Sequence, residues 1–129
     1  MFIEHIRLSK QGRSHLITLK RYTGIKNWNT LCRWGFCASL SDRSRPPETP
    51  VPADSNVEMT WKTFGGEYAE IYSLLLKQRL MEDGLPLDSE TLAHQFRLHL
   101  HRGIASLAGE QRIRSIADLI AYGLREEGS

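Results

Sequence analysis

The sequence has few of the features that mark secreted, membrane-spanning or nucleotide-binding proteins. It has only two cysteines, Cys32 and Cys37, whose spacing on a helical pattern turns them about 140° apart, so we expect buried thiols and no disulfide. No stretch approaches the roughly 18 to 20 apolar residues that cross a bilayer, and the first residues lack the apolar core of a signal peptide. No phosphate-binding loop, dinucleotide fingerprint or nucleophile elbow occurs. These absences favour a cytoplasmic chain without catalytic residues, resident metal or cofactor.

Acidic residues are scarce near the N-terminus, where basic residues are concentrated. Residues 1–45 contain nine Lys and Arg against two acidic residues, a net charge of +7, whereas residues 46–129 carry a net charge of −5. The overall net charge of +2 therefore conceals a basic segment. Such an excess on a short segment is typical of a chain that binds an anion, and polyphosphate backbones are the commonest partner.

The hydrophobic pattern predicts a mainly α-helical domain that begins with one short strand. Residues 2–8 alternate as a strand does, Ser9 can cap a helix over 10–22, and Gly24 can end it. A second helix follows over about 27–40. The proline-rich segment 41–56 predicts an extended loop, residues 57–64 a short strand, and segments 67–81, 89–107 and 115–124 three further helices. We therefore expect one domain of residues 1–129, with a DNA-binding part (1–40), a loop (41–56) and a helical part (57–124).

The basic residues of the first predicted helix gather on one side of it. At about 100° per residue, Lys10, Arg13, Lys20 and Arg21 lie opposite the apolar residues, and Lys26 follows at the start of the second helix. Almost no acidic residue is interleaved, although charged surfaces usually mix both signs. The free N–H groups and the dipole of a helix N-terminus also favour an anion beside Lys26. The pattern predicts phosphate binding, with a merely solvated face as the alternative.

The order of strand, helix and helix matches the ribbon-helix-helix plan of DNA-binding proteins. In that plan two strands pair across a dimer axis and enter the major groove, which would point Ile3, His5 and Arg7 into the groove. An isoleucine among them is poorly suited to reading bases, so a strand used only for packing is an equally good interpretation.

The second predicted helix has apolar residues nearly all the way round. A helix of this kind is buried on most faces, and in a chain of 129 residues we expect that burial to occur between subunits. Gly35 in mid-helix indicates a close helix–helix approach. The predicted interface residues are Trp28, Leu31, Gly35 and Phe36.

Two groups of side chains leave an enzymatic alternative open. His94 and His101 share a helix face with Glu90, and Glu67 and Glu70 stand one turn apart, so either group could hold a metal. Polar helix faces and acidic first turns are the commoner reasons for such patterns.

Three stretches carry a resemblance to a known family. The segment IRLSKQGRSHLITLKRYTGIKNWNTLCRWGFCASL, with VEMTWKTFGGE and LHLHRGI further on, resembles the DndE proteins of bacterial DNA phosphorothioation. The resemblance implies an accessory subunit of the machinery that replaces a non-bridging phosphate oxygen with sulfur. It also implies binding to duplex DNA, preferably nicked, a homo-oligomer expected as a tetramer, and sulfurtransferase-like and ATPase subunits as partners.

The resulting hypothesis is a DNA-binding accessory protein that is not an enzyme and acts in the cytoplasm, associated with the nucleoid. The expected phosphate contacts are Lys10, Arg13, Lys20, Arg21 and Lys26, with Arg7 and Arg33 as weaker candidates. Contacts of this kind position a protein on DNA without reading much sequence. The alternatives are a protein-interaction adaptor that does not touch DNA directly and, less favoured, a metal-dependent DNA-nicking enzyme.

Overall fold

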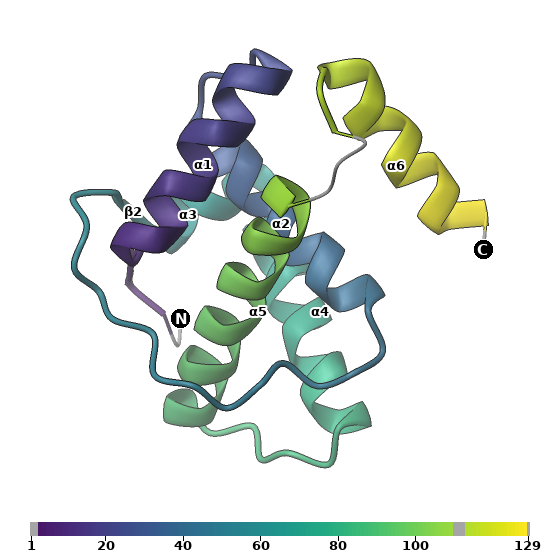
Figure 1. Cartoon of the computed structure of the whole chain (residues 1–129). Coiled ribbons are helices and arrows are strands. Elements are labelled where there is room, and N and C mark those ends of the chain that lie inside the picture. The colour runs from purple at the N-terminus through teal and green to yellow at the C-terminus, as the bar shows by residue number, and fades with distance from the viewer. Residues whose placement is uncertain (1–2, 110–112, 129) are drawn as a thin grey trace.

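The protein is mainly helical, as the sequence pattern predicts, with one short strand near the N-terminus and a second in the middle of the chain. The computed structural model describes residues 3–109 and 113–128. Its elements follow in the order β1 (His5–Arg7), α1 (Lys10–Thr23), α2 (Trp28–Ser41), β2 (Glu58–Thr60), α3 (Trp61–Gly65), the 3-10 turn η1 (Gly66–Tyr68), α4 (Ala69–Glu82), α5 (Ser89–Gly109) and α6 (Ile116–Gly128). Figure 1 shows α5 running through the middle of the molecule, with α1 and α2 at its C-terminal half and α4 beside its N-terminal half.

The predicted boundaries of α1 are confirmed by its caps. The Ser9 hydroxyl accepts a hydrogen bond from the Gly12 N–H at 3.0 Å, which satisfies one of the free donors of the first turn. At the other end, Gly24 takes a left-handed φ of 77° and its N–H donates to the Lys20 carbonyl at 2.9 Å. A side chain at position 24 would strain this turn.

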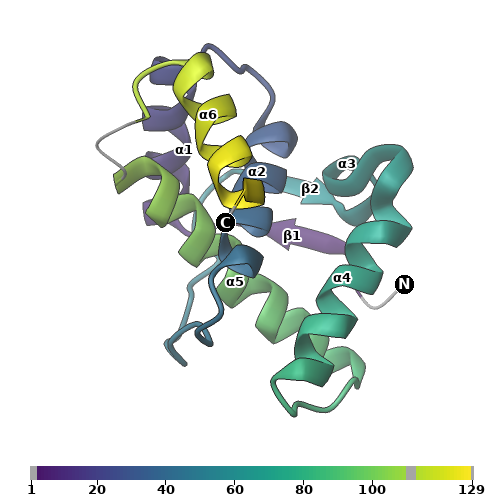
Figure 2. The same ribbon diagram turned by 90° about the vertical axis from the view of Figure 1, so that its right-hand side faces the viewer.

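β1 has its pairing partner inside its own chain. It lies antiparallel to β2, with His5 opposite Thr60, Ile6 opposite Met59 and Arg7 opposite Glu58 (Figure 2). Ile3 and Ile6 are both buried. The ribbon-helix-helix plan, which would pair β1 with the same strand of a second subunit, therefore describes the order of elements in this chain and not the observed pairing.

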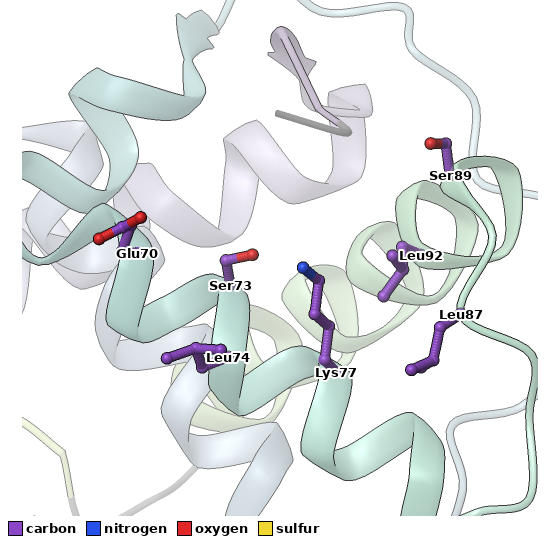
Figure 3. Close-up of a pocket in the computed structure, with 7 residues that line it drawn as sticks. All are labelled: Glu70, Ser73, Leu74, Lys77, Leu87, Ser89 and Leu92. Carbon is purple, nitrogen blue, oxygen red and sulfur yellow. The ribbon is translucent and has the colours of Figure 1, made fainter.

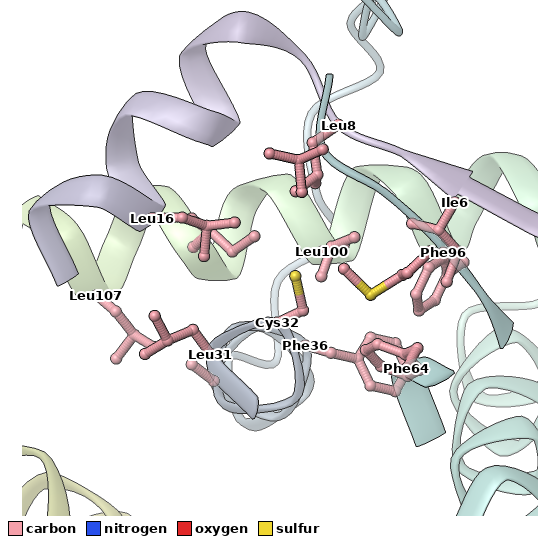
Figure 4. Close-up of a cluster of buried hydrophobic side chains, with 14 of the residues drawn as sticks. Ile6, Leu8, Leu16, Leu31, Cys32, Phe36, Phe64, Phe96, Leu100 and Leu107 are labelled. Carbon is pink, nitrogen blue, oxygen red and sulfur yellow. The ribbon is translucent and has the colours of Figure 1, made fainter. Parts of the chain in front are cut away.

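The core lies between α2 and α5, which approach each other unusually closely. Gly35 of α2 faces Gly103 and Ile104 of α5, and a Cβ added at Gly35 would stand 2.7 Å from Cγ1 of Ile104. Around this crossing the buried side chains of α1, α2, α3 and α5 converge (Figure 4). Phe36 and Phe96 meet the Phe64 ring edge to face, at ring-centroid distances of 5.9 and 5.1 Å.

This crossing corrects the predicted subunit interface. Leu31 and Phe36 are fully buried within the single chain, and Gly35 is buried against α5, so none of the three can contact a second subunit. Trp28 alone of the predicted interface residues remains half-exposed. The sequence pattern correctly indicates a close helix–helix approach, but the partner helix belongs to the same chain. Both cysteines are free; Cys32 is buried as expected, whereas Cys37 is exposed.

The proline-rich segment crosses α5 as an extended strap, without helix or strand (Figure 1). Three arginines of the C-terminal half hold it by its carbonyl groups. Arg79 donates to the carbonyls of Asp42 and Ser44, Arg102 to that of Ser44, and Arg97 to those of Val51 and Pro52. These three guanidinium groups therefore bind backbone carbonyls within the fold and not an external anion.

The segment after this strap departs from the prediction of a strand over 57–64. Only Glu58–Thr60 is extended, because the Thr60 hydroxyl accepts from the Thr63 N–H at 3.1 Å and starts α3. The later helices occur where predicted. α4 begins at Ala69 after the turn η1, Asp88 caps α5 at the Thr91 N–H, and the Ser115 hydroxyl caps α6 at the Asp118 N–H.

Candidate nucleic-acid interface

The outer side of α1 carries the basic residues that the sequence places there. The inner side buries Gly12, Leu16, Leu19 and Thr23 against the core. On the outer side Lys10 and Arg21 are exposed, Arg13 and Lys20 are half-exposed, and Lys26 is exposed at the start of α2. We call these five residues, Lys10, Arg13, Lys20, Arg21 and Lys26, the basic face. Ile17 lies among them with 36% of its surface exposed.

No side chain of the basic face forms an ion pair with a carboxylate within the part of the chain whose side chains are described. The ion pairs found there join His5 and Arg7 to Glu58, Arg79 to Asp83, His94 to Glu48, and Arg102 to Asp42. None of them involves a residue of the basic face. Five cations without a counter-ion leave a positive potential that an anionic polymer can satisfy.

Lys20 is held in place by an aromatic ring. Its Nζ lies 3.5 Å from the centroid of the Trp28 ring, a cation–π contact that joins the end of α1 to the start of α2. The first turn of α2 contains no acidic residue, and the side chain of Asn27 does not cap it. The N-terminal end of α2 thus keeps its positive dipole beside Lys26.

Arg7 and Arg33, the weaker candidates, are both engaged within the chain. Arg7 pairs with Oε2 of Glu58 at 2.8 Å and donates to the Ser55 carbonyl at 3.1 Å. Arg33 donates to the Phe64 carbonyl at 2.9 Å and to the Thr30 hydroxyl at 3.3 Å. Both guanidinium groups join separate segments of the fold. The structure therefore does not bring them together with the basic face as free cations.

α1 is anchored to α5 through a histidine. The Ser9 N–H donates to Nε2 of His101 at 3.1 Å, and Nδ1 of His101 donates to the Arg97 carbonyl at 2.9 Å. This arrangement requires a neutral ring, and burial lowers the pKa of His101 accordingly. Gly12 makes room for the ring, since a Cβ there would stand 3.0 Å from Cδ2 of His101.

Two residues near the basic face do not follow from the sequence pattern. Arg114 donates to the Tyr22 hydroxyl at 2.7 Å and places its guanidinium over the Tyr22 ring, so it adds positive charge near the end of α1. Asp54 accepts from the Lys10 N–H at 2.8 Å. Asp54 and Arg114 lie 44 and 104 positions beyond Lys10, so helical periodicity could not have linked them to α1.

The metal-binding alternatives are not assembled. His94 contacts Glu48 at 2.8 Å, whereas His101 contacts Ser9 and the Arg97 carbonyl, so neither histidine turns toward the other or toward Glu90. In the described part of the chain, no three His, Cys, Asp or Glu side chains form a possible metal site, and this includes Glu67 and Glu70. No helix in that part is long and apolar enough to cross a membrane.

A second surface, on α4, is apolar and exposed. Tyr68, Ile71, Leu74 and Met81 expose 55%, 52%, 63% and 66% of their surface, and Leu75 lies between them. We call these five residues the α4 face. A stripe of this size on a helix usually contacts another protein surface.

A cavity of about 590 Å³ lies beside the α4 face, between α4 and the start of α5. Leu74, Leu87 and Leu92 form its apolar lining, with Lys77 and Glu70 at its wall (Figure 3). The residues that line it include neither histidine nor cysteine, and no pair of carboxylates.

The comparisons with known proteins agree on one family. The family model of the DNA sulphur modification protein DndE matches residues 5–115. The crystal structure of DndE from Escherichia coli B7A, involved in DNA phosphorothioation modification, superposes with a TM-score of 0.68 at 28% identity, covering 83% of this chain and 98% of that one. A lysine-for-glycine double mutant of DndE, also involved in DNA phosphorothioation, shares the fold with a TM-score of 0.61 at 23% identity over 81% and 97% of the two chains. No curated protein matches the chain. The chain belongs to the DndE family of DNA sulphur modification proteins.

Proposed function

We propose that this chain is a DNA-binding accessory subunit of the phosphorothioation system, without catalytic activity of its own. It holds duplex or nicked DNA by its backbone phosphates through the basic face, with little sequence specificity. The observation that carries the proposal is that none of the side chains of Lys10, Arg13, Lys20, Arg21 and Lys26 forms an ion pair with a carboxylate among the described residues. Lysine and arginine on one helix face position a protein on DNA and leave the bases unread.

The salt dependence of duplex binding tests this proposal. Each phosphate neutralised by the protein contributes about 0.9 to the slope of log affinity against log salt concentration. Four or five contacts by the basic face predict a slope of about −4, with similar affinities for unrelated sequences. A slope near zero, or purified protein that fails to bind duplex or nicked DNA, would favour the adaptor alternative, in which the basic face docks on an acidic subunit of the modification complex.

The α4 face supports a homo-oligomer as the form that binds DNA. The stripe is nearly self-complementary when it is reversed. Tyr68 and Met81 lie at its two ends, Ile71 and Gln78 lie inside them, and Leu74 and Leu75 form the centre. Two copies of α4 packed antiparallel about a two-fold axis would therefore place Leu74 opposite Leu75 and Tyr68 opposite Met81, with Ile71 opposite the polar Gln78. A tetramer, expected for the family, would require one further contact and would multiply the basic face on one assembly.

The proposed partners follow from membership of the family. A subunit that only positions DNA requires others to carry out the chemistry, which the proposal assigns to sulfurtransferase-like and ATPase subunits of the same system. Its place of action is then the cytoplasm, at nucleoid DNA. Co-purification of the tagged chain with these subunits, with and without nuclease treatment, would separate direct protein contacts from contacts that DNA bridges.

A further inference from the structure

A cavity of about 510 Å³ opens between the start of α1 and the end of the proline-rich strap. Figure 1 shows the strap crossing α5 and rising toward β2 beside this end of α1. The residues that line the cavity are Lys10, Arg13, Ser14, Asp54, Ser55 and Asn56. Two members of the basic face, one helical turn apart, therefore share a hollow with polar groups from the strap.

Asp54 is fixed in this cavity by its neighbours. The N–H and the hydroxyl of Ser55 both donate to the Leu8 carbonyl, at 3.1 and 2.8 Å, and the Leu8 N–H donates to the Val57 carbonyl at 3.0 Å. This ladder continues the pairing of β1 with β2 and places Oδ1 of Asp54 2.8 Å from the backbone N–H of Lys10. The carboxylate thus occupies a position at the N-terminus of α1 where anions are favoured.

The side chains of Lys10 and Arg13 in this cavity are not paired with a carboxylate in the described part of the chain. Asp54 binds the backbone of Lys10 and forms no ion pair with the Lys10 ammonium or the Arg13 guanidinium in the described part of the chain. Nε of Arg13 is buried without an acceptor there. The cavity therefore holds two cations that can bind an anion, next to one fixed negative charge that opposes it.

We propose that this cavity is a seat for one phosphate group of bound DNA, held by Lys10 and Arg13, and that Asp54 weakens the seat by repulsion. The inference rests on the proposed function and names a single phosphate site within the basic face. A carboxylate beside the seat lowers its affinity for every phosphate alike, because the repulsion does not depend on the base. Asp54 therefore keeps binding at this end of α1 weak and reversible.

The substitution Asp54→Asn tests the proposal, because an amide oxygen can still accept from the Lys10 N–H while the negative charge is removed. Glu82→Gln at the exposed end of α4 removes the same charge away from the cavity and serves as the matched control. We expect Asp54→Asn to tighten duplex binding by about three- to tenfold at low salt, and Glu82→Gln to change it by less than about twofold. Equal affinities of the two variants would overturn the proposal.

The double variant Asp54→Asn/Arg13→Ala separates a seat from a general change of charge. If Arg13 holds the phosphate, the gain from Asp54→Asn is mostly lost in the Arg13→Ala background, because the two residues act on the same group. A gain in affinity of the same size in both backgrounds would overturn the proposal that Arg13 and Asp54 act on the same phosphate. Circular dichroism at 222 nm checks that the variants remain folded.

A titration with inorganic phosphate distinguishes failure of this inference from failure of the proposed function. If no variant binds DNA, the proposed function fails, and the titration alone decides whether an anion seat exists. We expect phosphate to shift the amide resonances of Lys10 and Gln11, and to do so at lower concentration in Asp54→Asn. An absence of such shifts in both proteins would overturn the seat.

Discussion

Gly35 and Gly103 lie in direct contact where α2 crosses α5, and a Cβ atom built on Gly103 would overlap the carbonyl oxygen of Gly35. The contact is between backbones, so rotation of a side chain cannot relieve the overlap. The crossing brings together the helix that carries the aromatic residue Phe36 and the helix that anchors α1 through His101. The position of the basic face therefore depends on two glycines that do not contact it.

We expect Gly103→Ala to destabilise the protein by about 3 kcal/mol or more, because α2 and α5 must move apart to admit the methyl group. Gly109→Ala is the matched control, since a Cβ at Gly109 meets nothing within 4 Å. The control should change the free energy of unfolding by less than about 1 kcal/mol. Denaturation with urea, followed by circular dichroism, measures both. Equal stability of the two variants would contradict the packing described for this crossing.

Arg33 should matter for stability and not for DNA affinity. Replacement by Ala removes the hydrogen bond to the Phe64 carbonyl, which joins α2 to the end of α3, and the hydrogen bond to the Thr30 hydroxyl within α2. We expect a loss of about 1 to 2 kcal/mol in the free energy of unfolding. Duplex affinity at 20 °C, below the unfolding transition, should remain within about twofold of the unmodified protein. A large loss of DNA affinity with unchanged stability would indicate that Arg33 does contact DNA phosphates.

His99 should make stability depend on pH. The ring is fully buried, its Nδ1 lies 2.8 Å from the Ser39 hydroxyl oxygen, and its pKa is lowered to about 4 by burial and then by the nearby Arg79 and Arg102. Asp83 and Asp42 act in the opposite direction. Because the native pKa lies below the unfolded value of 6.5, the unfolded state binds the proton first as the pH falls.

The stabilisation due to neutral His99 is therefore present above pH 6.5 and decreases as the pH falls toward 4. We expect a loss of about 2 kcal/mol between pH 7 and pH 5. Urea denaturation at a series of pH values measures the loss. His99→Gln should remove this contribution, while the contribution of His101, whose pKa burial also lowers, should remain. A pH dependence of unchanged size in His99→Gln would assign it to other groups.

The α4 face should determine the oligomeric state. We expect Leu74→Lys to convert the oligomer to smaller species, because it places charges at the centre of the antiparallel contact. Its helical content should be retained, since Leu74 is 63% exposed within the single chain. Ile120→Lys on α6 changes another exposed apolar residue, which is 50% exposed, and serves as the control. Light scattering coupled to size-exclusion chromatography reports the masses. An oligomer of unchanged mass in Leu74→Lys would show that α4 does not form the subunit interface.

The local part of this structure is predictable from the sequence, and the long-range part is not. Ser9, Gly24 and Ser115 mark helix ends through hydrogen bonds between residues three or four positions apart, and the basic face follows from the period of one helix. By contrast, the burial of Leu31 in an apolar helix is the same signal whether the covering surface is α5 or a second subunit. The hydrophobic pattern of α2 alone could not show which of these two surfaces covers Leu31.

The engagement of Arg7 and Arg33 was hidden for the same reason. Their partners, Glu58 and the Phe64 carbonyl, lie 51 and 31 positions further along the chain. A charge count treats these two arginines like Arg21, although only the fold decides which cations stay free. Likewise, nothing in the sequence indicates that Asp54, in the proline-rich loop, lies at the start of α1, because the path of the strap decides this contact.

The central claim is that the basic face binds DNA phosphates, and reversal of charge on it is the most direct test. Arg21 and Lys26 are both exposed and form no hydrogen bond or ion pair through their side chains in the described structure, so Arg21→Glu/Lys26→Glu should leave the fold intact. Arg43→Glu/Lys62→Glu changes the net charge equally at exposed positions off α1. The account predicts that duplex affinity at low salt falls at least about tenfold in the first variant, with a shallower salt slope, and less than about threefold in the second. Equal affinities of the two variants, with the oligomer intact, would contradict it.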